Sequence, residues 1–261
     1  MKIVATTTQS REEPDVVFRQ FLIDSGFEYV PRRRGGLKAI REEHQADAVL
    51  VWQPQGPVLH LGDNKLFFHP SMAKIRLAAY RNKGQVDPLI EAARVEADDA
   101  VLDCTLGLGA DSIVLAYFAR AGEVLSLESS PAIAYTIKWG MRLYQSSMPW
   151  LDEAIHRVKV KAADHLSYLQ NLPDNCYDIV YFDPMFRNPL LKSETLSPIR
   201  VLGNTQALTE EAVNEGRRVA RKRVVIKERA QSTEFARLGC HRIAGSIHNQ
   251  VHFGIIDNAN D

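Results

Sequence analysis

The chain has 261 residues, which suffices for one large domain or for a medium domain with a small companion. Hydrophobic residues make up 45% and charged residues 25% of the chain, and 32 basic residues balance 32 acidic ones. A formal net charge of zero excludes an overall electrostatic attraction to nucleic acid, so any basic surface must be local.

The first part of the chain carries short, mixed patterns. Apolar runs predict strands at residues 2–7, 47–53, 57–61 and 65–69. Helices are expected at residues 13–26 and 37–45. Pro14 should lie in the first turn of the earlier helix, and Gly26 should end it. We therefore predict a small N-terminal α+β domain over residues 1–69.

From residue 70 onward, two helices come first and a regular alternation follows. Ser71 can cap a helix that runs through Tyr80 and stops near Gly84, and a second helix is expected over residues 86–95. Apolar strands are then expected at residues 100–105, 123–128, 157–164, 177–183 and 223–228. Apolar residues at helical spacing place helices between them, at residues 110–122, 131–145, 165–173 and 209–220.

Strands that alternate with helices predict right-handed crossovers and a parallel sheet that is covered on both faces. The last segment, residues 240–257, predicts an antiparallel hairpin. We therefore predict a second, α/β domain over residues 70–261. Its sheet should be seven-stranded and mostly parallel, with the C-terminal antiparallel hairpin at one edge.

A glycine turn follows the first strand of this alternating region. In "VLDCTLGLGADS", Gly107 and Gly109 separate the strand from the next helix, at the edge of the sheet where such folds bind ligands. Ser112 occupies the third glycine position of a dinucleotide fingerprint, which disfavours NAD. Glu128 ends the next strand about twenty residues on, at the spacing where an acid meets ribose hydroxyls. The alternative is a plain tight turn beside a solvated acid.

Acidic residues end three successive strands, at Glu128, Asp164 and Asp183. Without a phosphate-binding signature, this arrangement favours S-adenosylmethionine (SAM), which has no pyrophosphate and carries a positive sulfonium. Asp103 and Asp111 flank the glycine turn and could also face that charge. Two of these acids have structural alternatives, because Asp164 can cap a helix and Asp111 can serve as a first-turn helix acid.

The order of these motifs, from "VLDCTLGLGADSIVLA" through "LSLESSP" and "KVKAAD" to "YDIVYFDPMF", resembles class I SAM-dependent methyltransferases. It is more closely similar to the RsmJ family, which methylates the exocyclic N2 of guanine in small-subunit ribosomal RNA. The likeness covers roughly residues 100–230 and includes the late strand "RVVIKER". It implies a Rossmann-like fold and SAM as the cofactor.

By position, the resemblance implies cofactor contacts at the glycine turn and at three strand ends, namely Ala110, Asp111, Glu128, Ser129, Ala163, Asp164 and Asp183. The expected cofactor site also includes residues in and before the same turn, namely Asp103, Thr105, Gly107 and Gly109. The chain differs from the family at Ala110, at Ala163-Asp164 and at Arg187-Asn188. Cofactor binding is therefore expected, while the target nucleotide stays open.

The segment "DPMF" follows the fourth strand and predicts how an amine would be held. The Asp183 carboxylate and the Pro184 carbonyl would accept hydrogen bonds from the amine. Phe186 would stack on the base, which must first leave the stack of neighbouring bases in the nucleic acid. These three residues, Asp183, Pro184 and Phe186, are the expected catalytic residues, and together they are called the amine clamp. Because the lone pair of an exocyclic amine is delocalised into the ring, such bonds favour a more tetrahedral nitrogen aimed at the methyl group. Alternatively, Asp183 caps a strand and Pro184 ends its ladder.

Two basic clusters are candidate RNA contacts. Arg32, Arg33 and Arg34 lie in "PRRRGG", and "GRRVARKRVVIKER" holds seven basic residues and one acid. Such side chains position RNA through its phosphates without reading sequence. Arg187, beside the amine clamp, and Lys227, inside the fifth strand, are further candidates for substrate contact. The alternative is that these residues only form solvated basic faces.

Three cysteines lie far apart without a CxxC motif, so neither a disulfide framework nor a zinc site is expected, and no metal is predicted. No apolar run is long enough to cross a bilayer and the start has no signal-peptide core, so we expect a cytoplasmic protein. We predict a methyltransferase that acts on guanine N2 in ribosomal RNA. A methyltransferase that acts on a protein side chain or a small molecule is the alternative.

Overall fold

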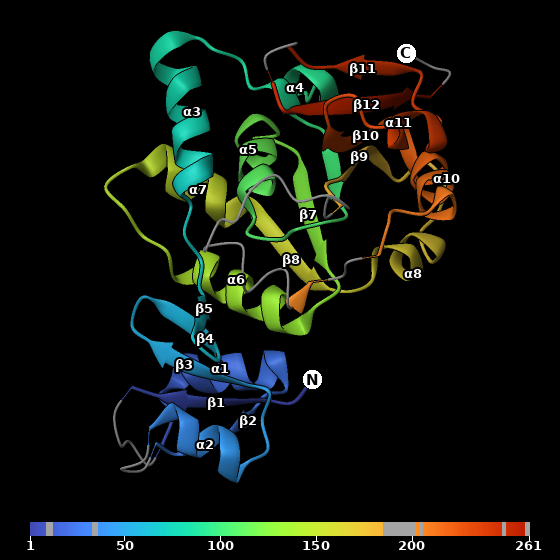
Figure 1. The fold of residues 1–261 in the computed structure, drawn as a ribbon. Coiled ribbons are helices and arrows are strands. Elements are labelled where there is room, and N and C mark those ends of the chain that lie inside the picture. The colour runs from blue at the N-terminus through green and yellow to red at the C-terminus, as the bar shows by residue number, and fades with distance from the viewer. Residues whose placement is uncertain (9–12, 33–35, 185–201, 204–205, 247–248, 259–261) are drawn as a thin grey trace.

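The computed structural model describes residues 1–8, 13–32, 36–184, 202–203, 206–246 and 249–258. Within these residues the chain forms two β-sheets, of five and of seven strands. The five-stranded sheet is built from residues near the N-terminus, and the long helix α3 (Ser71–Lys83) leads from it to the larger sheet (Figure 1). Among the residues that the structure describes, no helix combines the length and the apolar composition needed to cross a membrane.

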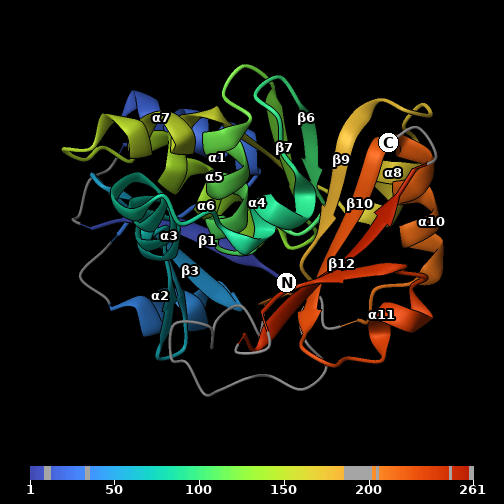
Figure 2. The ribbon, with the colours of Figure 1, turned by 90° about the horizontal axis from the view of Figure 1, so that it is seen from above.

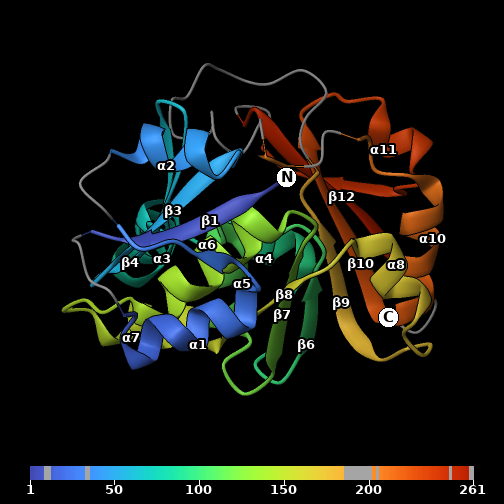
Figure 3. The ribbon, with the colours of Figure 1, turned by 90° about the horizontal axis from the view of Figure 1, so that it is seen from below.

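The smaller sheet has the strand order β2-β1-β3-β4-β5. Its strands are β1 (Ile3–Thr7), β2 (Glu28–Tyr29), β3 (Ala48–Gln53), β4 (Gly56–Leu61) and β5 (Asn64–Leu66). β1 pairs in parallel with both β2 and β3, whereas β3, β4 and β5 form an antiparallel meander. Two helices accompany this sheet (Figure 3), α1 (Val16–Ser25) and α2 (Leu37–Glu43).

The larger sheet has the strand order β11-β12-β10-β9-β6-β7-β8. Its strands are β6 (Ala100–Asp103), β7 (Glu123–Glu128), β8 (Val158–Ala162), β9 (Tyr177–Phe182), β10 (Ala220–Arg229), β11 (Arg242–Ala244) and β12 (Val251–Asp257). Five strands run in parallel, and the β11–β12 hairpin joins β10 in antiparallel register. The predicted mostly parallel, seven-stranded Rossmann-like sheet with a C-terminal hairpin is therefore confirmed.

Helices cover both faces of the larger sheet (Figure 2). One face carries α4 (Pro88–Ala93), α5 (Ala110–Phe118), α6 (Pro131–Leu143) and α7 (Pro149–Arg157), and the other carries α8 (His165–Gln170) and α10 (Glu210–Val219). Side chains alternate across the strands, so Ile179 and Tyr181 of β9 enter one core while Val180 and Phe182 enter the other. The apolar run of β9 is explained by this burial on both faces.

Two helix starts differ from the sequence prediction. The Asp15 side chain accepts a hydrogen bond from the Phe18 N–H at 2.8 Å, so α1 begins at Val16 and Pro14 lies before the cap. Ser71 is the first residue of α3, and its hydroxyl contacts the His69 ring instead of capping the helix. The sequence analysis also missed α7 and the short α11 (Glu234–Arg237).

An aromatic cluster joins the two sheets. Trp139 of α6 packs against Phe21 of α1 at 5.8 Å and against Trp52 of β3 at 5.9 Å between ring centroids. Its indole N–H donates to Asp24 at 2.8 Å. The next residue, Gly140, allows Phe68 to pack closely on α6, because a Cβ on Gly140 would lie 2.2 Å from the Phe68 Cβ. One hydrophobic core thus contains residues from both sides of residue 70, and the proposed boundary between domains 1–69 and 70–261 stays a prediction.

Candidate active site

A pocket lies where the carboxyl ends of β6, β7 and β9 meet. Six of the residues predicted for the site line it, namely Thr105, Gly107, Glu128, Ser129, Asp183 and Pro184. Parallel strands end at the same edge of a sheet, so residues that are distant in sequence meet there. Cys104 and His165 also line the pocket, although the sequence analysis did not name them for the site.

The glycine turn forms one wall of this pocket. Gly107 has φ +51° and Gly109 has φ +78°, values that side chains with a Cβ rarely adopt. A Cβ on Gly109 would also lie 2.1 Å from the Met141 Cε, which packs beneath the turn. The Leu106 N–H donates to the Leu127 carbonyl at 2.8 Å and joins the turn to the end of β7. The turn therefore favours glycine at both positions, and the close Met141 side chain leaves no room for a Cβ at Gly109.

Glu128 is held at the end of β7 with only 8% of its surface exposed. Its carboxylate accepts hydrogen bonds from the Ser130 N–H at 2.9 Å and from the Gly107 N–H at 3.2 Å. Burial raises the pKa of Glu128, although these backbone bonds oppose the rise. A carboxylate has about four lone-pair sites, so it can still accept from the two hydroxyls of a ribose. The position and the acceptor chemistry of Glu128 fit a nucleoside cofactor.

Asp103 supports the turn from below. It is completely buried and accepts from the Thr105 N–H at 2.9 Å and from the Ser112 hydroxyl at 2.6 Å. Ser112 therefore has a structural task at the position where a dinucleotide fingerprint would have its third glycine. Burial raises the pKa of Asp103 to about 7, against the effect of these two bonds.

The predicted contacts at the third strand lie beside the pocket. Asp164 accepts from the Ser167 N–H at 2.9 Å and is the N-cap of α8, which confirms the structural alternative for this residue. That bond, with the help of the neighbouring His165 charge, lowers the pKa of Asp164. Ala163 precedes the cap, and Ala110 is the first residue of α5. Cofactor contact at these three residues stays a prediction.

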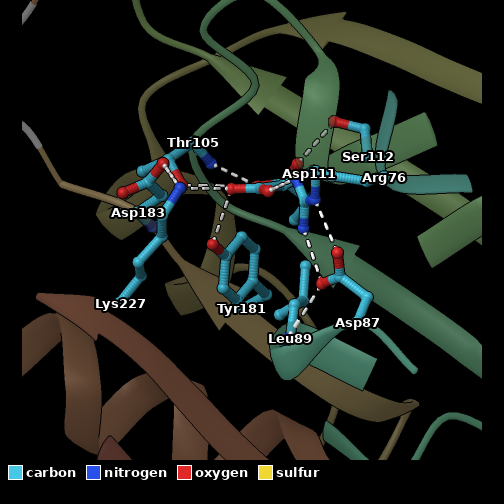
Figure 4. A network of polar contacts seen from close by, with 10 residues as sticks. Arg76, Asp87, Leu89, Thr105, Asp111, Ser112, Tyr181, Asp183 and Lys227 are labelled. Atoms are coloured by element: carbon cyan, nitrogen blue, oxygen red, sulfur yellow. Dashed lines mark hydrogen bonds and ion pairs between the residues drawn. The ribbon is translucent and has the colours of Figure 1, made fainter. Parts of the chain in front are cut away.

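A buried network of charges lies beneath the pocket (Figure 4). The Lys227 ammonium donates to Asp183 Oδ2 and to Asp111 Oδ2, at 2.8 Å each. The Tyr181 hydroxyl donates to the same Asp111 oxygen at 2.8 Å, and Arg76 of α3 binds the other Asp111 oxygen. Arg76 also forms a two-pronged pair with Asp87, at 2.7 and 2.8 Å.

The charges in this network set the ionisation of its acids. Burial alone would raise the pKa of Asp111, but Lys227 and Arg76 hold it well below its usual range. Burial raises the pKa of Asp183 to about 6; Lys227 lowers it, and the Asp111 charge adds to the rise. Two cations face three carboxylates, Asp87, Asp111 and Asp183, which leaves one negative charge in excess beside the pocket. An excess negative charge at this place fits a cationic sulfonium.

Thr105 fixes the backbone where β9 ends and Asp183 begins the segment predicted to hold an amine. The Asp183 N–H donates to the Thr105 hydroxyl oxygen at 2.6 Å. The Thr105 hydroxyl in turn lies 3.3 Å from Asp103 Oδ1, to which it donates. The end of β9 is thereby joined to the end of β6, and the side chain of Asp183 lies at the pocket rather than capping its own strand.

Several predicted substrate contacts lie outside the described residues, namely Phe186, Arg187, Arg33 and Arg34. Arg32 is described and lies beside the smaller sheet, where burial and the charges of Lys65 and Arg32 lower the pKa of His60. In the second basic cluster, Arg221 pairs with Asp178 at 2.7 Å, and Arg218 pairs with Asp174 at 2.6 Å. Both pairs lie near the amino end of β9, away from the pocket, so these two arginines have structural partners.

The described residues include one acidic group whose geometry could hold a metal ion, formed by Glu96, Asp98 and Asp99. Lys222 already binds two of these carboxylates, at Glu96 and at Asp99. The group precedes β6 at the edge of the sheet opposite the pocket. The expectation that no metal takes part in the reaction stays a prediction.

The sequence analysis did not identify Arg76 or Tyr181 as part of the site. Tyr181 lies in an apolar strand and is fully buried, and a buried tyrosine hydroxyl normally requires a partner. Tyr181 lies two residues before Asp183, so the need of its hydroxyl for a partner could have indicated a polar contact near the site. Arg76 lies in α3, 35 residues before Asp111, and no motif marks it. Lys227, predicted as a substrate contact, binds Asp183 instead of standing free in the pocket.

Comparison with known proteins agrees with this geometry. The model of a family described as "Putative SAM-dependent methyltransferase" matches residues 40–244. "Uncharacterized protein YpiP" of Bacillus subtilis (strain 168) is 29% identical over 258 residues, which are 98% of this chain and 100% of that protein. A SAM-dependent methyltransferase from Neisseria gonorrhoeae, known from a crystal structure, has a TM-score of 0.68 at 19% identity and covers 100% of this chain and 97% of its own. It shares the fold.

Two further relatives are named "Ribosomal RNA small subunit methyltransferase J". The protein of Thioalkalivibrio sulfidiphilus is 30% identical over 168 residues, 61% of this chain and 64% of that protein. The protein of Buchnera aphidicola is 26% identical over 171 residues, 62% of this chain and 66% of that protein. The match thus spans just under two thirds of either relative.

The family model covers well over half of the chain and includes the glycine turn, Glu128 and Asp183. The Rossmann-like sheet and the acidic pocket at its carboxyl edge agree with that match. The chain therefore belongs to this family and is a SAM-dependent methyltransferase, with S-adenosylmethionine as its methyl donor.

Proposed function

We propose that the enzyme methylates an exocyclic amino group of a base in ribosomal RNA, with guanine N2 as the expected target. One observation carries this proposal: Asp183 and Pro184 follow β9 directly and line the same pocket as Glu128. An acceptor pair is thus placed beside the residues expected to hold the methyl donor. The names of the two methyltransferase J relatives support ribosomal RNA as the substrate class.

The geometry supports a mechanism based on orientation. Bound SAM supplies a methyl group activated by its sulfonium. The Asp183 carboxylate would accept a hydrogen bond from one amine N–H, and the Pro184 carbonyl would accept one from the other. These bonds would reduce the delocalisation of the nitrogen lone pair into the ring. Asp183 is also placed to receive the proton that the amine loses on methylation. No covalent intermediate is required, because holding the reactants in line can supply about 7–11 kcal/mol of the barrier.

A substrate of this size must also be bound outside the pocket. Arg32 supplies basic charge beside the smaller sheet. Arg33 and Arg34 follow it in the sequence, and Arg187 follows Asp183-Pro184-Met185-Phe186. We propose these residues as phosphate contacts, since such contacts position RNA without reading its sequence. Ribosomal RNA as substrate would also place the enzyme in the cytoplasm, as the sequence analysis expects.

The test combines an in vivo and an in vitro measurement. Nucleoside mapping by mass spectrometry of ribosomal RNA should show one methylated guanine missing in a strain that lacks this protein. Undermethylated RNA from that strain then serves as substrate for the purified enzyme. Asp183→Ala should lower the transfer rate by roughly 10²- to 10⁴-fold, as for other positioned proton acceptors, while S-adenosylhomocysteine still binds. Full activity of Asp183→Ala would exclude the proposed role.

Asp174→Ala is the matched control, because this aspartate is exposed and pairs only near the amino end of β9. Its transfer rate should equal that of the parent enzyme. Salt separates the proposal from the alternative, a methyltransferase for a protein side chain or a small molecule. RNA binding through several phosphates should weaken steeply as salt rises, whereas turnover of a small molecule should not.

A further inference from the structure

We propose that Lys227 and Asp111 are positioning residues for Asp183. Lys227, anchored on Asp111, holds one oxygen of the Asp183 carboxylate and keeps that group charged while its other oxygen is offered to the substrate amine. The proposal rests on the proposed function, because Asp183 is what gives the network a part in catalysis. It assigns Lys227 to the enzyme's own machinery rather than to substrate binding.

Asp111 has the geometry of a fixed anchor. Its side chain is 10% exposed, and both of its oxygens are engaged. One binds Arg76, and the other accepts from Tyr181 and Lys227 at 2.8 Å each. A carboxylate held from three directions by α3, β9 and β10 cannot rotate without breaking a buried charged bond, and such a bond is worth about 1.5–3 kcal/mol. Asp111 therefore determines where the Lys227 ammonium lies.

Among the residues that the structure describes, the partners of the Asp183 carboxylate lie on one side only. Lys227 binds its Oδ2, and 28% of its side chain is exposed at the pocket. Figure 4 shows the second oxygen of Asp183 pointing away from Asp111 and Lys227. This is the orientation that an acceptor for an external N–H requires, with one oxygen tethered and the other presented.

The positive charge of Lys227 also offsets the repulsion between the Asp111 and Asp183 carboxylates. Asp111 and Asp183 both bind its ammonium, so the two carboxylates lie close together beside other ionisable groups. These groups are Arg76 of α3, Asp103 of β6, Tyr181 of β9, Glu128 of β7 and His165 of α8. When two carboxylates share a site, the pKa of one of them is strongly raised, and Arg76 would still stabilise the charge of Asp111. Without Lys227, Asp183 would take up a proton and lose acceptor capacity.

The same strand contains a matched control. Lys222 of β10 also bridges two carboxylates, binding Asp99 at 2.8 Å and Glu96 as well. It resembles Lys227 in residue type, strand and pairing, but it lies at the opposite edge of the sheet. Lys222→Met therefore removes a comparable ion pair without touching the pocket.

The experiment follows the carboxyl carbons of the enzyme by ¹³C NMR as pH is varied, in the complex with S-adenosylhomocysteine. Asp183→Asn assigns the resonance. Lys227→Met should raise the pKa of Asp183 by about 1 to 3, the usual effect of losing a cation at this distance. Asp111→Asn should lower it, because a neighbouring negative charge is removed while Lys227 remains. Lys222→Met should leave it unchanged, and Lys227→Arg should largely restore the parent value.

Opposite shifts in the two variants support the proposal, since general structural damage would not change sign between them. An unmoved resonance, or shifts in one direction, overturns it. If Lys227→Met does not fold, Lys227→Gln takes its place, because glutamine also removes the positive charge but keeps a donor for the two carboxylates. The kcat profiles should shift in the same directions on their acid side. Full activity of Asp183→Ala would overturn the proposed function alone, because the NMR titration needs no RNA.

Discussion

The clearest prediction concerns Glu128→Gln and the affinity for the cofactor. The substitution preserves size, but it replaces one carboxylate oxygen with an NH₂ group. In the structure both oxygens accept from backbone N–H groups, of Ser130 at 2.9 Å and Gly107 at 3.2 Å. Whichever oxygen the NH₂ group replaces, it faces a backbone N–H. Two hydrogen-bond donors then oppose each other at a residue that is only 8% exposed. If Glu128 binds the ribose hydroxyls as predicted, these hydroxyls also lose a charged acceptor.

A hydrogen bond to a charged group is worth about 1.5–3 kcal/mol. Since about 1.4 kcal/mol corresponds to a tenfold change in affinity, the Kd for S-adenosylhomocysteine should rise roughly 10- to 140-fold. Isothermal titration calorimetry measures it directly, and thermal unfolding of the same samples confirms that the variant is folded. Glu123→Gln is the control, because Glu123 begins the same strand and pairs at the surface with Lys159 at 3.0 Å. A Kd for Glu128→Gln within about twofold of the parent value would refute the assignment.

Two further predictions concern pH and stability. Burial raises the pKa of Asp183 to about 6. In the proposed role the ionised form holds the amine, so kcat should be full above that pH and fall as pH drops through it. A kcat that stays constant down to about pH 5 would contradict this role. Trp139 is 1% exposed and packs on Phe21 and Trp52, so Trp139→Ala should lower the free energy of unfolding by about 3–5 kcal/mol, as measured by urea denaturation. Trp150→Ala, at a half-buried position beneath Arg81, should cost clearly less, and equal losses would contradict the large contribution expected of the aromatic cluster.

Much of the methyltransferase fold could be predicted from local patterns. Strands buried on both faces are continuous apolar runs, and amphipathic helices repeat every 3.6 residues, so their alternation predicts a parallel sheet. Strand ends follow directly from these runs. Glu128 and Asp183 could therefore be placed at the pocket, because each follows an apolar run at the carboxyl edge of the sheet.

The sequence was less informative where a residue can have more than one structural role. Pro14 is a good first-turn residue, but the Asp15 side chain caps the helix one position later. Asp164 is a helix cap through its bond to the Ser167 N–H, and its predicted cofactor contact stays a prediction. These outcomes depend on which donor the side chain meets, and the residue type alone does not decide that.

The sequence by itself determined the order of the elements, the glycine turn and the acids at the strand ends, because these depend on neighbours within a few residues. Only the tertiary structure decided what those acids bind. Lys227 meets Asp111 across 116 residues and Asp183 across 44, and Arg76 meets Asp111 across 35. Such pairs depend on strand order and on how α3 packs, so no local pattern specifies them. The same holds for Trp139, which joins two sheets whose contact only the folded chain creates.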